Sequence, residues 1–258
     1  MWIPISNVPI ACSPHFEVVE ESDDWIVVDK GAPLIVHPSN NRVEPTLLEG
    51  VETLLSYDIA NGAILALVNR LDRETSGLTL IAKNKAAARE LGKAMQRRLI
   101  HKEYLAIVHG RPEWSEITCN EPIQQQRAIA ESRIWVKQII HPIGKECSTS
   151  FYVEQTWSGP YGQLSLIRCI PRTGRMHQIR VHLSHMGYPI VGDKIYGPSE
   201  DCYLEYIQNG WSTELEKQLI LPRHALHACL LRFPFGEKTF TAQATLPEDM
   251  QNLLDKRM

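Results

Sequence analysis

The segment NRLDRETSG (69–77) concentrates ionisable side chains between two apolar stretches of the chain. A simple turn between strands needs only small or turn-forming residues, so this density of charge is unusual. Asp72 lies between Arg70 and Arg73, and the two cations favour its ionised form. An ionised, oriented carboxylate can act as a nucleophile or as a general base. On this pattern alone, a surface loop with a local salt bridge is an equally good interpretation.

A second polar segment, PRTGRMHQIRVHLSHMG (171–187), has helical spacing and is rich in arginine and histidine. Arg180 lies at the edge of the apolar face of the predicted helix, one turn after His177. A guanidinium in that place can reach into a cleft and pair with a carboxylate or a phosphate. A polar surface helix is the alternative that the pattern leaves open.

Other ionisable or aromatic residues give weaker indications. His177, His182 and His185 are spread around the polar side of the same helix with no matching carboxylate motif, so no metal site is expected. The six cysteines lie far apart, which argues against a zinc ribbon and a disulfide framework. Tyr104 alternates with apolar residues in KEYLAIVHG, so it is either a cross-strand core residue or a ring on which a base can stack.

The composition is typical of a globular protein, with 258 residues, 43% hydrophobic content and a net charge of −3. Acidic residues gather near 17–29 and 199–216, whereas lysine and arginine gather at 83–102 and 168–180. A basic face on an acidic whole is therefore expected, because binding depends on the local field. The chain has no apolar run of about 18 residues and no signal-like start, so we expect no membrane association and a cytoplasmic location.

The elements that would position these residues follow from periodicity and caps. Strands are expected on both sides of a Gly-Pro turn at 31–33, and at 65–68, 78–82, 102–110, 149–155, 164–170, 228–233 and 239–244. Helices are expected over 46–57, over 85–99 after an Asn84 cap, and over 175–186, capped by Thr173 and ended by Gly187. Strands outnumber helices without alternating with them, which predicts an α+β fold on a mixed, mainly antiparallel sheet flanked by helices.

Together these segments resemble the RluA-type family of RNA pseudouridine synthases. The motifs that carry the resemblance are NRLDRETSGLTLIAK, KEYLAIVHG, RTGRMHQIRVHLSHMGYPIVGDKIYG and LHA at 226–228, in the family's order. The resemblance implies a pseudouridine synthase catalytic domain over 16–258 after an N-terminal extension at 1–15. The chain resembles the compact members of the family, which lack an N-terminal RNA-binding module, and we expect the protein to be monomeric.

The resemblance also implies roles for individual residues. Asp72 matches the essential aspartate, Tyr104 the tyrosine that stacks on the target base, and Arg180 the basic residue paired with the aspartate. Arg70 matches the arginine that enters the RNA where the uridine flips out. We further expect RNA contacts from Arg73, Arg175 and His177.

The implied reaction isomerises a uridine to pseudouridine in transfer RNA or ribosomal RNA, and it needs no cofactor. The glycosidic bond breaks, the uracil rotates, and the bond re-forms through carbon. One position and one segment depart from the family pattern. Asn69 replaces the usual histidine, and Lys30-Gly31-Ala32-Pro33 replaces the usual Lys-Pro-small-Gly segment. We expect position 69 to tolerate substitution. These departures keep open an alternative, a catalytically idle RNA-binding or RNA-remodelling protein that uses the same cleft.

Overall fold

A large mixed sheet forms the centre of the molecule in the computed structural model, which describes residues 16–37 and 44–255. Within these residues the main sheet has the strand order β1-β2-β4-β11-β5-β10-β9-β6, with β3 beside β4 and β12 beside β11, while β7 and β8 pair separately. The strands are β1 Phe16–Glu21, β2 Trp25–Lys30, β3 Ala66–Leu67, β4 Ser76–Ala82, β5 His101–His109, β6 Glu116–Cys119, β7 Ile123–Gln125, β8 Gln138–Ile140, β9 Thr149–Gly159, β10 Gly162–Pro171, β11 Leu226–Phe235 and β12 Lys238–Gln243. The helices are α1 Leu47–Leu54, α2 Ser56–Ala60, α3 Lys85–Gln96, α4 Gln178–His185, α5 Asp201–Asn209, α6 Thr213–Leu219 and α7 Glu248–Asp255, with a 3-10 turn η1 at Gln126–Ala128.

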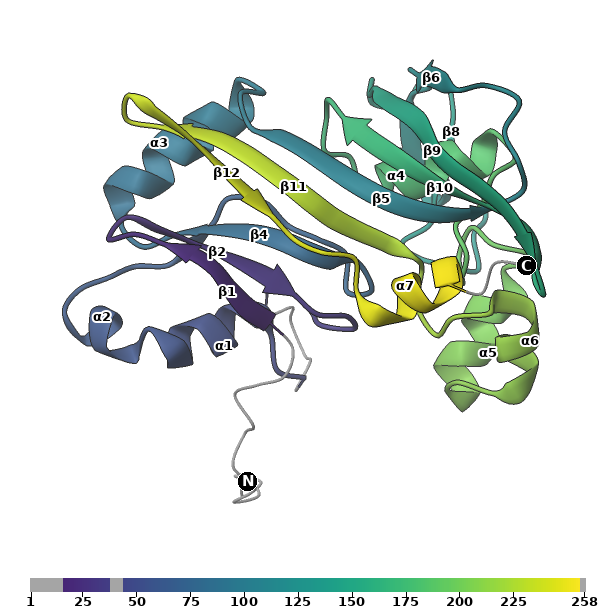
Figure 1. The fold of residues 1–258 in the computed structure, drawn as a ribbon, viewed down its shortest axis with the longest axis horizontal. Helices are drawn as coiled ribbons and strands as arrows, with labels where there is room; N and C mark the ends of the chain where they lie inside the picture. Colours follow the sequence, from purple (N-terminus) through teal and green to yellow (C-terminus); the bar gives the residue numbers. More distant parts are fainter. Residues whose placement is uncertain (1–15, 38–43, 256–258) are drawn as a thin grey trace.

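The long strands β5 and β11 cross the molecule and join its two halves (Figure 1). Neighbouring strands are antiparallel except β4 and β11, which run parallel where Ser76 and Gly77 meet His227 and Ala228. Gly77 permits this close pairing, since it has φ of +111° and an added Cβ would lie 2.3 Å from the Ala228 carbonyl oxygen. The predicted α+β fold with a mixed, mainly antiparallel sheet is confirmed.

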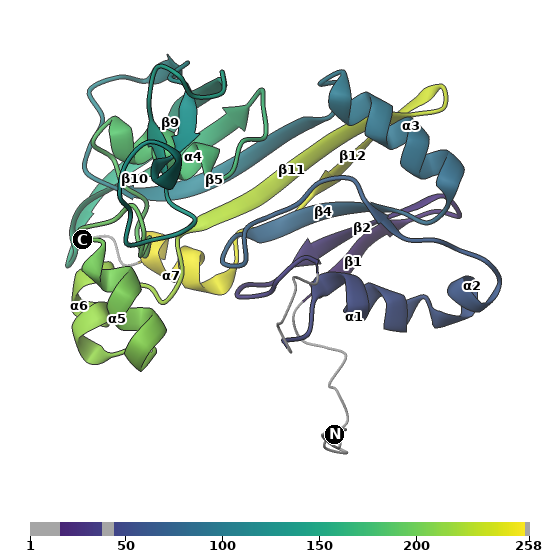
Figure 2. The same cartoon turned by 180° about the vertical axis from the view of Figure 1, so that it is seen from behind.

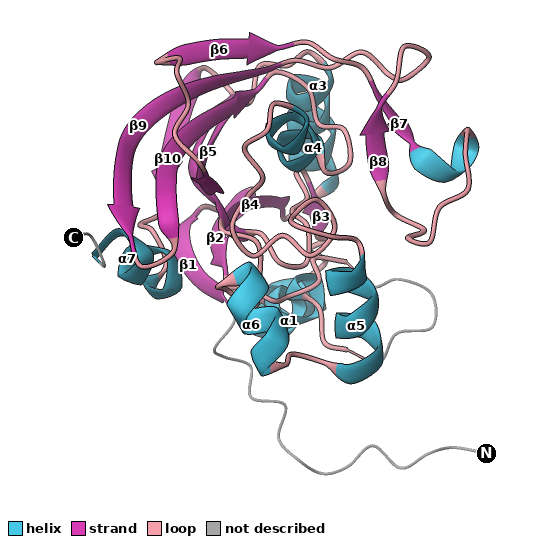
Figure 3. Cartoon of the chain, turned by 90° about the vertical axis from the view of Figure 1, so that its right-hand side faces the viewer, coloured by secondary structure: helices cyan, strands magenta, loops and turns pink. Residues whose placement is uncertain are grey.

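Helices pack on the two halves of the sheet and bury its apolar side chains. α3 begins at the predicted Asn84 cap, whose side chain accepts a hydrogen bond from the Ala87 N–H. Its buried face, including Leu91, packs against the β2, β4 and β11 side chains around Trp25. The helix and these strands are seen from behind in Figure 2. In the other half, α4 lies inside the curve of β9 and β10 (Figure 3), with Leu183 fully buried. The sheet thereby places the β3–β4 loop opposite the start of α4.

The first hairpin differs from the sequence prediction. Its turn lies at Ser22–Asp24, where the Ser22 hydroxyl oxygen accepts hydrogen bonds from the N–H groups of Asp24 and Trp25. The segment 31–36 does not form a strand, apart from a bridge between Ile35 and Thr46. A serine turn therefore joins the strands, and the Gly-Pro segment follows the second strand. The predicted extension at 1–15 lies outside the described residues.

Helix α4 also differs from its prediction at its start. It begins at Gln178 rather than at 175, and its N-cap is His177 with φ of +56°, so Thr173 is not the cap. Gly187 ends the helix as predicted, because its N–H donates to the Ser184 carbonyl while the next N–H donates to the Leu183 carbonyl. The delayed start leaves residues 172–177 as a loop at the edge of a cleft.

Candidate active site

The loop 69–75 between β3 and β4 carries Asp72 and is held in place by its first residue. Asn69 is buried, its amide donates to the Leu78 carbonyl, and its side-chain oxygen accepts from the Leu80 N–H at 2.7 Å. The side chain thus joins the loop to the backbone of β4. The structure gives position 69 a definite part in the fold, in contrast to the tolerance expected from the sequence.

Asp72 forms an ion pair with Arg180, and a second aspartate holds that arginine from behind. Arg180 Nη1 donates to Asp72 Oδ2 at 3.0 Å. The rest of the guanidinium donates to both oxygens of Asp193, at 2.7 Å from Nε and 2.9 Å from Nη2. Asp193 is fully buried and also accepts the N–H groups of Ile195 and Tyr196. Arg180 is buried, whereas the Asp72 side chain is 31% exposed, so the carboxylate faces the cleft from a rigid base.

The protonation states of this group follow from burial and charge. Burial raises the pKa of Asp72, but the charge of His177 (present only when that ring is protonated at acid pH), the charge of Arg180 and the hydrogen bond from Arg180 outweigh it, so the pKa lies below its ordinary value. Burial likewise opposes ionisation of Asp193, yet Arg180 lowers the pKa of that carboxyl far below its usual range. Burial and the charge of Arg180 lower the pKa of His177 to about 4. His177 is therefore neutral near pH 7, and Arg180 is the cation that keeps Asp72 ionised.

Tyr104 lies on β5 at the floor of an inner cavity of about 110 Å³. The cavity is also lined by Asp72, Arg180, Ile179 and Leu226. Burial, followed by the negative charge of Asp72, raises the pKa of the Tyr104 phenol above its ordinary value. The phenol is consequently protonated at neutral pH, and its ring is available to a planar group in the cavity.

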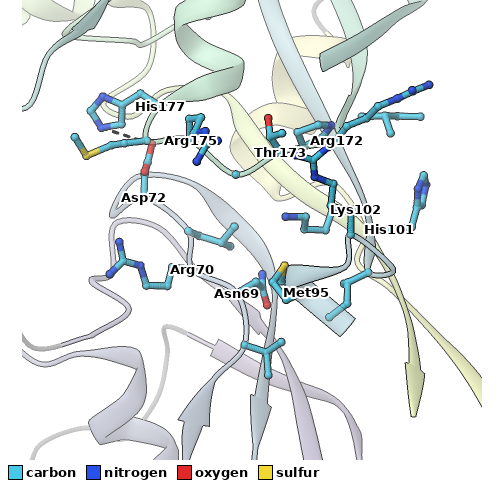
Figure 4. Close-up of a pocket in the computed structure, with 18 of the residues that line it drawn as sticks. Asn69, Arg70, Asp72, Met95, His101, Lys102, Arg172, Thr173, Arg175 and His177 are labelled. Atoms are coloured by element: carbon cyan, nitrogen blue, oxygen red, sulfur yellow. Dashed lines mark ion pairs between the residues drawn. The ribbon is translucent and has the colours of Figure 1, made fainter. Parts of the chain in front are cut away.

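The inner cavity shares part of its lining with a larger cleft of about 1130 Å³ (Figure 4). Among the lining residues that the structure describes, Asp72 is the only acidic one. The lysine and arginine side chains of the lining are Arg70, Arg73, Arg98, Lys102, Arg172 and Arg175. A basic cleft therefore exists on a chain whose net charge is −3, and the acidic Asp72 lies within it.

The four residues expected to contact RNA all line this cleft, in different settings. Arg70 is exposed and lines both cavities. Arg73 forms an exposed ion pair with Glu44 at 3.0 Å. Arg175 is exposed and donates to the Glu146 carbonyl at 3.3 Å. His177 differs from the arginines, because its side chain is 9% exposed and its Nε2 lies 3.9 Å from Asp72 Oδ2.

The loop 172–177 is shaped by the buried side chain of Gln178. Its Oε1 accepts from the Thr173 hydroxyl at 2.7 Å and from the Arg175 N–H at 3.0 Å. Its Nε2 donates to the Ser148 carbonyl and to the Thr149 hydroxyl on β9. Thr173 thus bonds to a side chain instead of to the helix backbone, which explains why it does not cap α4.

The Asp72 loop is fixed at its other end by buried polar groups. Lys194 Nζ lies 2.7 Å from Glu74 Oε1, and the Thr75 hydroxyl lies 2.7 Å from His224 Nε2. The first contact joins the loop to the segment that carries Asp193, and the second joins it to the residues just before β11. The catalytic candidates are therefore held from both sides of the cleft.

Neither a metal cluster nor a membrane-crossing helix is found in the residues that the structure describes. No group of three or more histidine, cysteine, aspartate or glutamate side chains is placed to hold a metal ion there. His182 is buried and contacts Thr149 and the Glu121 carbonyl, whereas His185 is exposed. None of the described helices combines the length and the apolar character that spanning a bilayer requires.

Comparison with known proteins decides the family. The sequence model described as RNA pseudouridylate synthase matches residues 24–185. The chain belongs to this family. Ribosomal large subunit pseudouridine synthase D of Salmonella typhimurium is 33% identical over 93% of this chain and 69% of its own length. An uncharacterised RNA pseudouridine synthase of Helicobacter pylori is 32% identical over 90% of this chain and 74% of its own.

Solved structures agree with the fold. Human RNA pseudouridylate synthase domain containing 4 has a TM-score of 0.69 at 22% identity and covers 93% of this chain and 92% of its own. Human RNA pseudouridylate synthase domain containing 1 has a TM-score of 0.66 at 24% identity, and the match covers 93% of this chain and 94% of its own. The predicted resemblance to RluA-type synthases is confirmed, and the chain is an RNA pseudouridine synthase.

Sequence reasoning did not single out several residues of this synthase's site. Asp193 and Tyr196 lie in the motif GDKIYG, which contributed to the resemblance without receiving a role. Gln178 lies in the predicted helix, where a glutamine is unremarkable. The sequence signal for Asp193 and Tyr196 is their place in a short segment bounded by glycines, soon after the helix that carries Arg180. This pattern does not reveal which residues they contact.

Proposed function

We propose that this synthase uses Asp72 to isomerise one specific uridine in structured RNA, after the nucleotide has flipped into the cavity beside Tyr104. The observation that carries the proposal is the ion pair between Arg180 and Asp72, a carboxylate that lines both the basic cleft and the inner cavity. The carboxylate is ionised and partly exposed, as a nucleophile or base toward the sugar must be.

The other site residues have complementary proposed roles. The Tyr104 ring stacks on the uracil, and its raised pKa favours this role over that of a base. Arg70 enters the gap that the flipped nucleotide leaves, which offsets part of the few kcal/mol lost from stacking and pairing. Arg73 and Arg175 bind the RNA backbone from the two sides of the cleft.

The reaction requires only rearrangement within the substrate. The bond between C1′ of the ribose and N1 of the uracil breaks, and a bond between C1′ and C5 forms. The C5 proton is lost, and N1 gains a proton, so the reaction is balanced without a redox partner. No cofactor is needed for this sequence of steps.

Ribosomal RNA of the large subunit is the proposed first substrate to test, because the names of several relatives specify it. Transfer RNA is the second substrate class. We propose that the protein acts in the cytoplasm as a monomer.

Mapping pseudouridine in RNA from cells with and without the gene tests the proposed function. The expected result is the loss of one or a few pseudouridines in ribosomal RNA, restored in vitro by the purified protein. Loss of pseudouridines from transfer RNA alone would instead identify transfer RNA as the substrate. RNA that binds tightly and gains no pseudouridine after long incubation would instead favour the catalytically idle RNA-binding protein.

A further inference from the structure

The hydroxyl of Tyr196 lies between a backbone N–H and a ring nitrogen of His177. The Gln138 N–H donates to the hydroxyl oxygen at 2.9 Å, and His177 Nδ1 lies 2.7 Å from the same oxygen. Tyr196 is 7% exposed, so these contacts are shielded from water. Its main-chain N–H donates to Asp193, which connects the tyrosine to the Arg180 site.

Counting protons in this chain of contacts selects one tautomer of His177. The backbone N–H of Gln138 can only donate, so the Tyr196 oxygen must accept there. The hydroxyl proton then needs an acceptor, and among the described residues His177 Nδ1 is the one within reach. If Nδ1 carried the proton instead, a buried hydroxyl proton would have no acceptor, which is costly. The ring proton of His177 must therefore lie on Nε2.

We propose that Tyr196 is a positioning residue whose hydroxyl fixes His177 as the Nε2–H tautomer, so that the ring presents a neutral N–H donor beside Asp72. This inference deepens the proposed function and rests on it. The role is distinct from the RNA contact expected of His177, because it concerns the carboxylate of Asp72 and the nucleotide next to it.

The position of His177 suits a donor that completes its hydrogen bond when substrate is bound. Its Nε2 faces Asp72 Oδ2 at 3.9 Å, which is too long for a hydrogen bond in the free protein (Figure 4). Catalytic hydrogen bonds commonly shorten in the substrate complex. His177 lines both the cleft and the inner cavity, so its Nε2–H can reach Asp72 or an oxygen of the flipped nucleotide.

Burial is the main cause that keeps the His177 ring neutral, and the charged groups around the ring act in both directions. Arg180 on α4 opposes its protonation, whereas Asp72 on the β3–β4 loop and Asp193 after α4 favour protonation. Burial adds to the effect of Arg180, whose guanidinium also lies over the Tyr196 ring at 5.0 Å. A neutral N–H can orient the carboxylate without placing a second full cation beside it.

The first test reads the tautomer directly by ¹⁵N NMR of the histidine ring nitrogens in the full-length protein. The His177 signal is assigned by its absence in His177→Asn. The expected spectrum has a protonated Nε2 and an unprotonated Nδ1 at neutral pH. A protonated Nδ1 in the wild-type protein would overturn the inference, whether or not the protein is active on the chosen RNA.

The second test compares Tyr196→Phe with a matched control, Tyr203→Phe. Tyr203 packs in the same apolar cluster as Tyr196, and each substitution removes one hydroxyl. Loss of the Tyr196 donor should raise the His177 pKa from about 4 toward its ordinary value, since the neutral ring loses a hydrogen bond. It should lower kcat about five- to tenfold, the equivalent of one neutral hydrogen bond, with KM changed less than about twofold.

The pH profile separates positioning from a purely structural role. In Tyr196→Phe the acid limb of the kcat profile should move to higher pH, whereas Tyr203→Phe should retain the wild-type profile. Identical kcat values and profiles for the two variants would refute the role of Tyr196. A wild-type protein that forms no pseudouridine would refute the proposed function, and the NMR result would still decide the tautomer.

Discussion

Replacing Asp193 with asparagine should both destabilise the fold and weaken the site, although Asp193 does not line either cavity. In the native protein Oδ1 accepts from Arg180 Nη2 and from two backbone N–H groups, while Oδ2 accepts from Arg180 Nε. The asparagine oxygen will take the position with three donors. Its amide NH₂ must then face the Nε–H of Arg180 at about the native 2.7 Å, so two donors oppose each other.

The size of the effect follows from burial. Asp193 is fully buried and Arg180 is 5% exposed, so water cannot replace the lost partner. Removing one member of a buried ion pair costs about 3–5 kcal/mol. A domain is stable by only about 5–15 kcal/mol, so this loss is a large share of the total.

Urea unfolding and a conversion assay measure the two consequences of Asp193→Asn. Asp201→Asn is the matched control, because Asp201 pairs with Arg133 at 2.8 Å but the two side chains are 72% and 60% exposed. The control should cost less than about 1 kcal/mol. Asp193→Asn should also lower kcat, since Arg180 would no longer be held toward Asp72. Stability and kcat equal to those of the control would refute the view that Asp193 supports the site.

Three further predictions concern the β3–β4 loop that carries Asp72 and the residues that hold it. Lys30→Met should destabilise the protein by about 2–4 kcal/mol in urea unfolding, because the buried amine donates to the carbonyls of Gly31, Leu34 and Arg73; the exposed Lys238→Met is the control. Asn69→Ala should cost about 1–3 kcal/mol and lower kcat, since it releases the Asp72 loop from β4; unchanged stability and kcat would contradict this. The folded-state pKa of Asp72 is lowered, so its contribution to stability is present above its unfolded pKa of about 3.9 and is lost as the pH falls through the folded value. The stability difference between wild type and Asp72→Asn should therefore shrink below about pH 4, and a difference that grows there would contradict the sign.

The elements that local sequence determines were predicted well. The Asn84 cap and the spacing of Leu91 depend on neighbours along one helix, and α3 starts where they indicate. The start of α4 depends instead on the Gln178 side chain, which bonds to residues on β9 and in the preceding loop. The first hairpin turns at Ser22, whose hydroxyl oxygen accepts two backbone N–H groups, rather than at the stronger turn pattern of Gly31 and Pro33. Contacts between distant segments therefore decide the start of α4, whereas the turn of the first hairpin depends on a local serine signal.

The candidate site was predictable in part. Pattern alone left Asp72 as equally compatible with a surface salt bridge, and only the ordered set of motifs singled it out. In the structure Asp72 contacts Arg180 at 3.0 Å across 108 positions of the chain. Asp193 and Tyr196 could not be given roles, because their contacts depend on how the segment after α4 folds back onto the helix.

The catalytic role of Asp72 is tested most directly by single-turnover conversion of a substrate RNA by wild type and Asp72→Asn at equal RNA occupancy. The proposed role predicts that Asp72→Asn binds the RNA, keeps the native fold, and forms no detectable pseudouridine. Pseudouridine formation by this variant within about tenfold of the wild-type rate would contradict it.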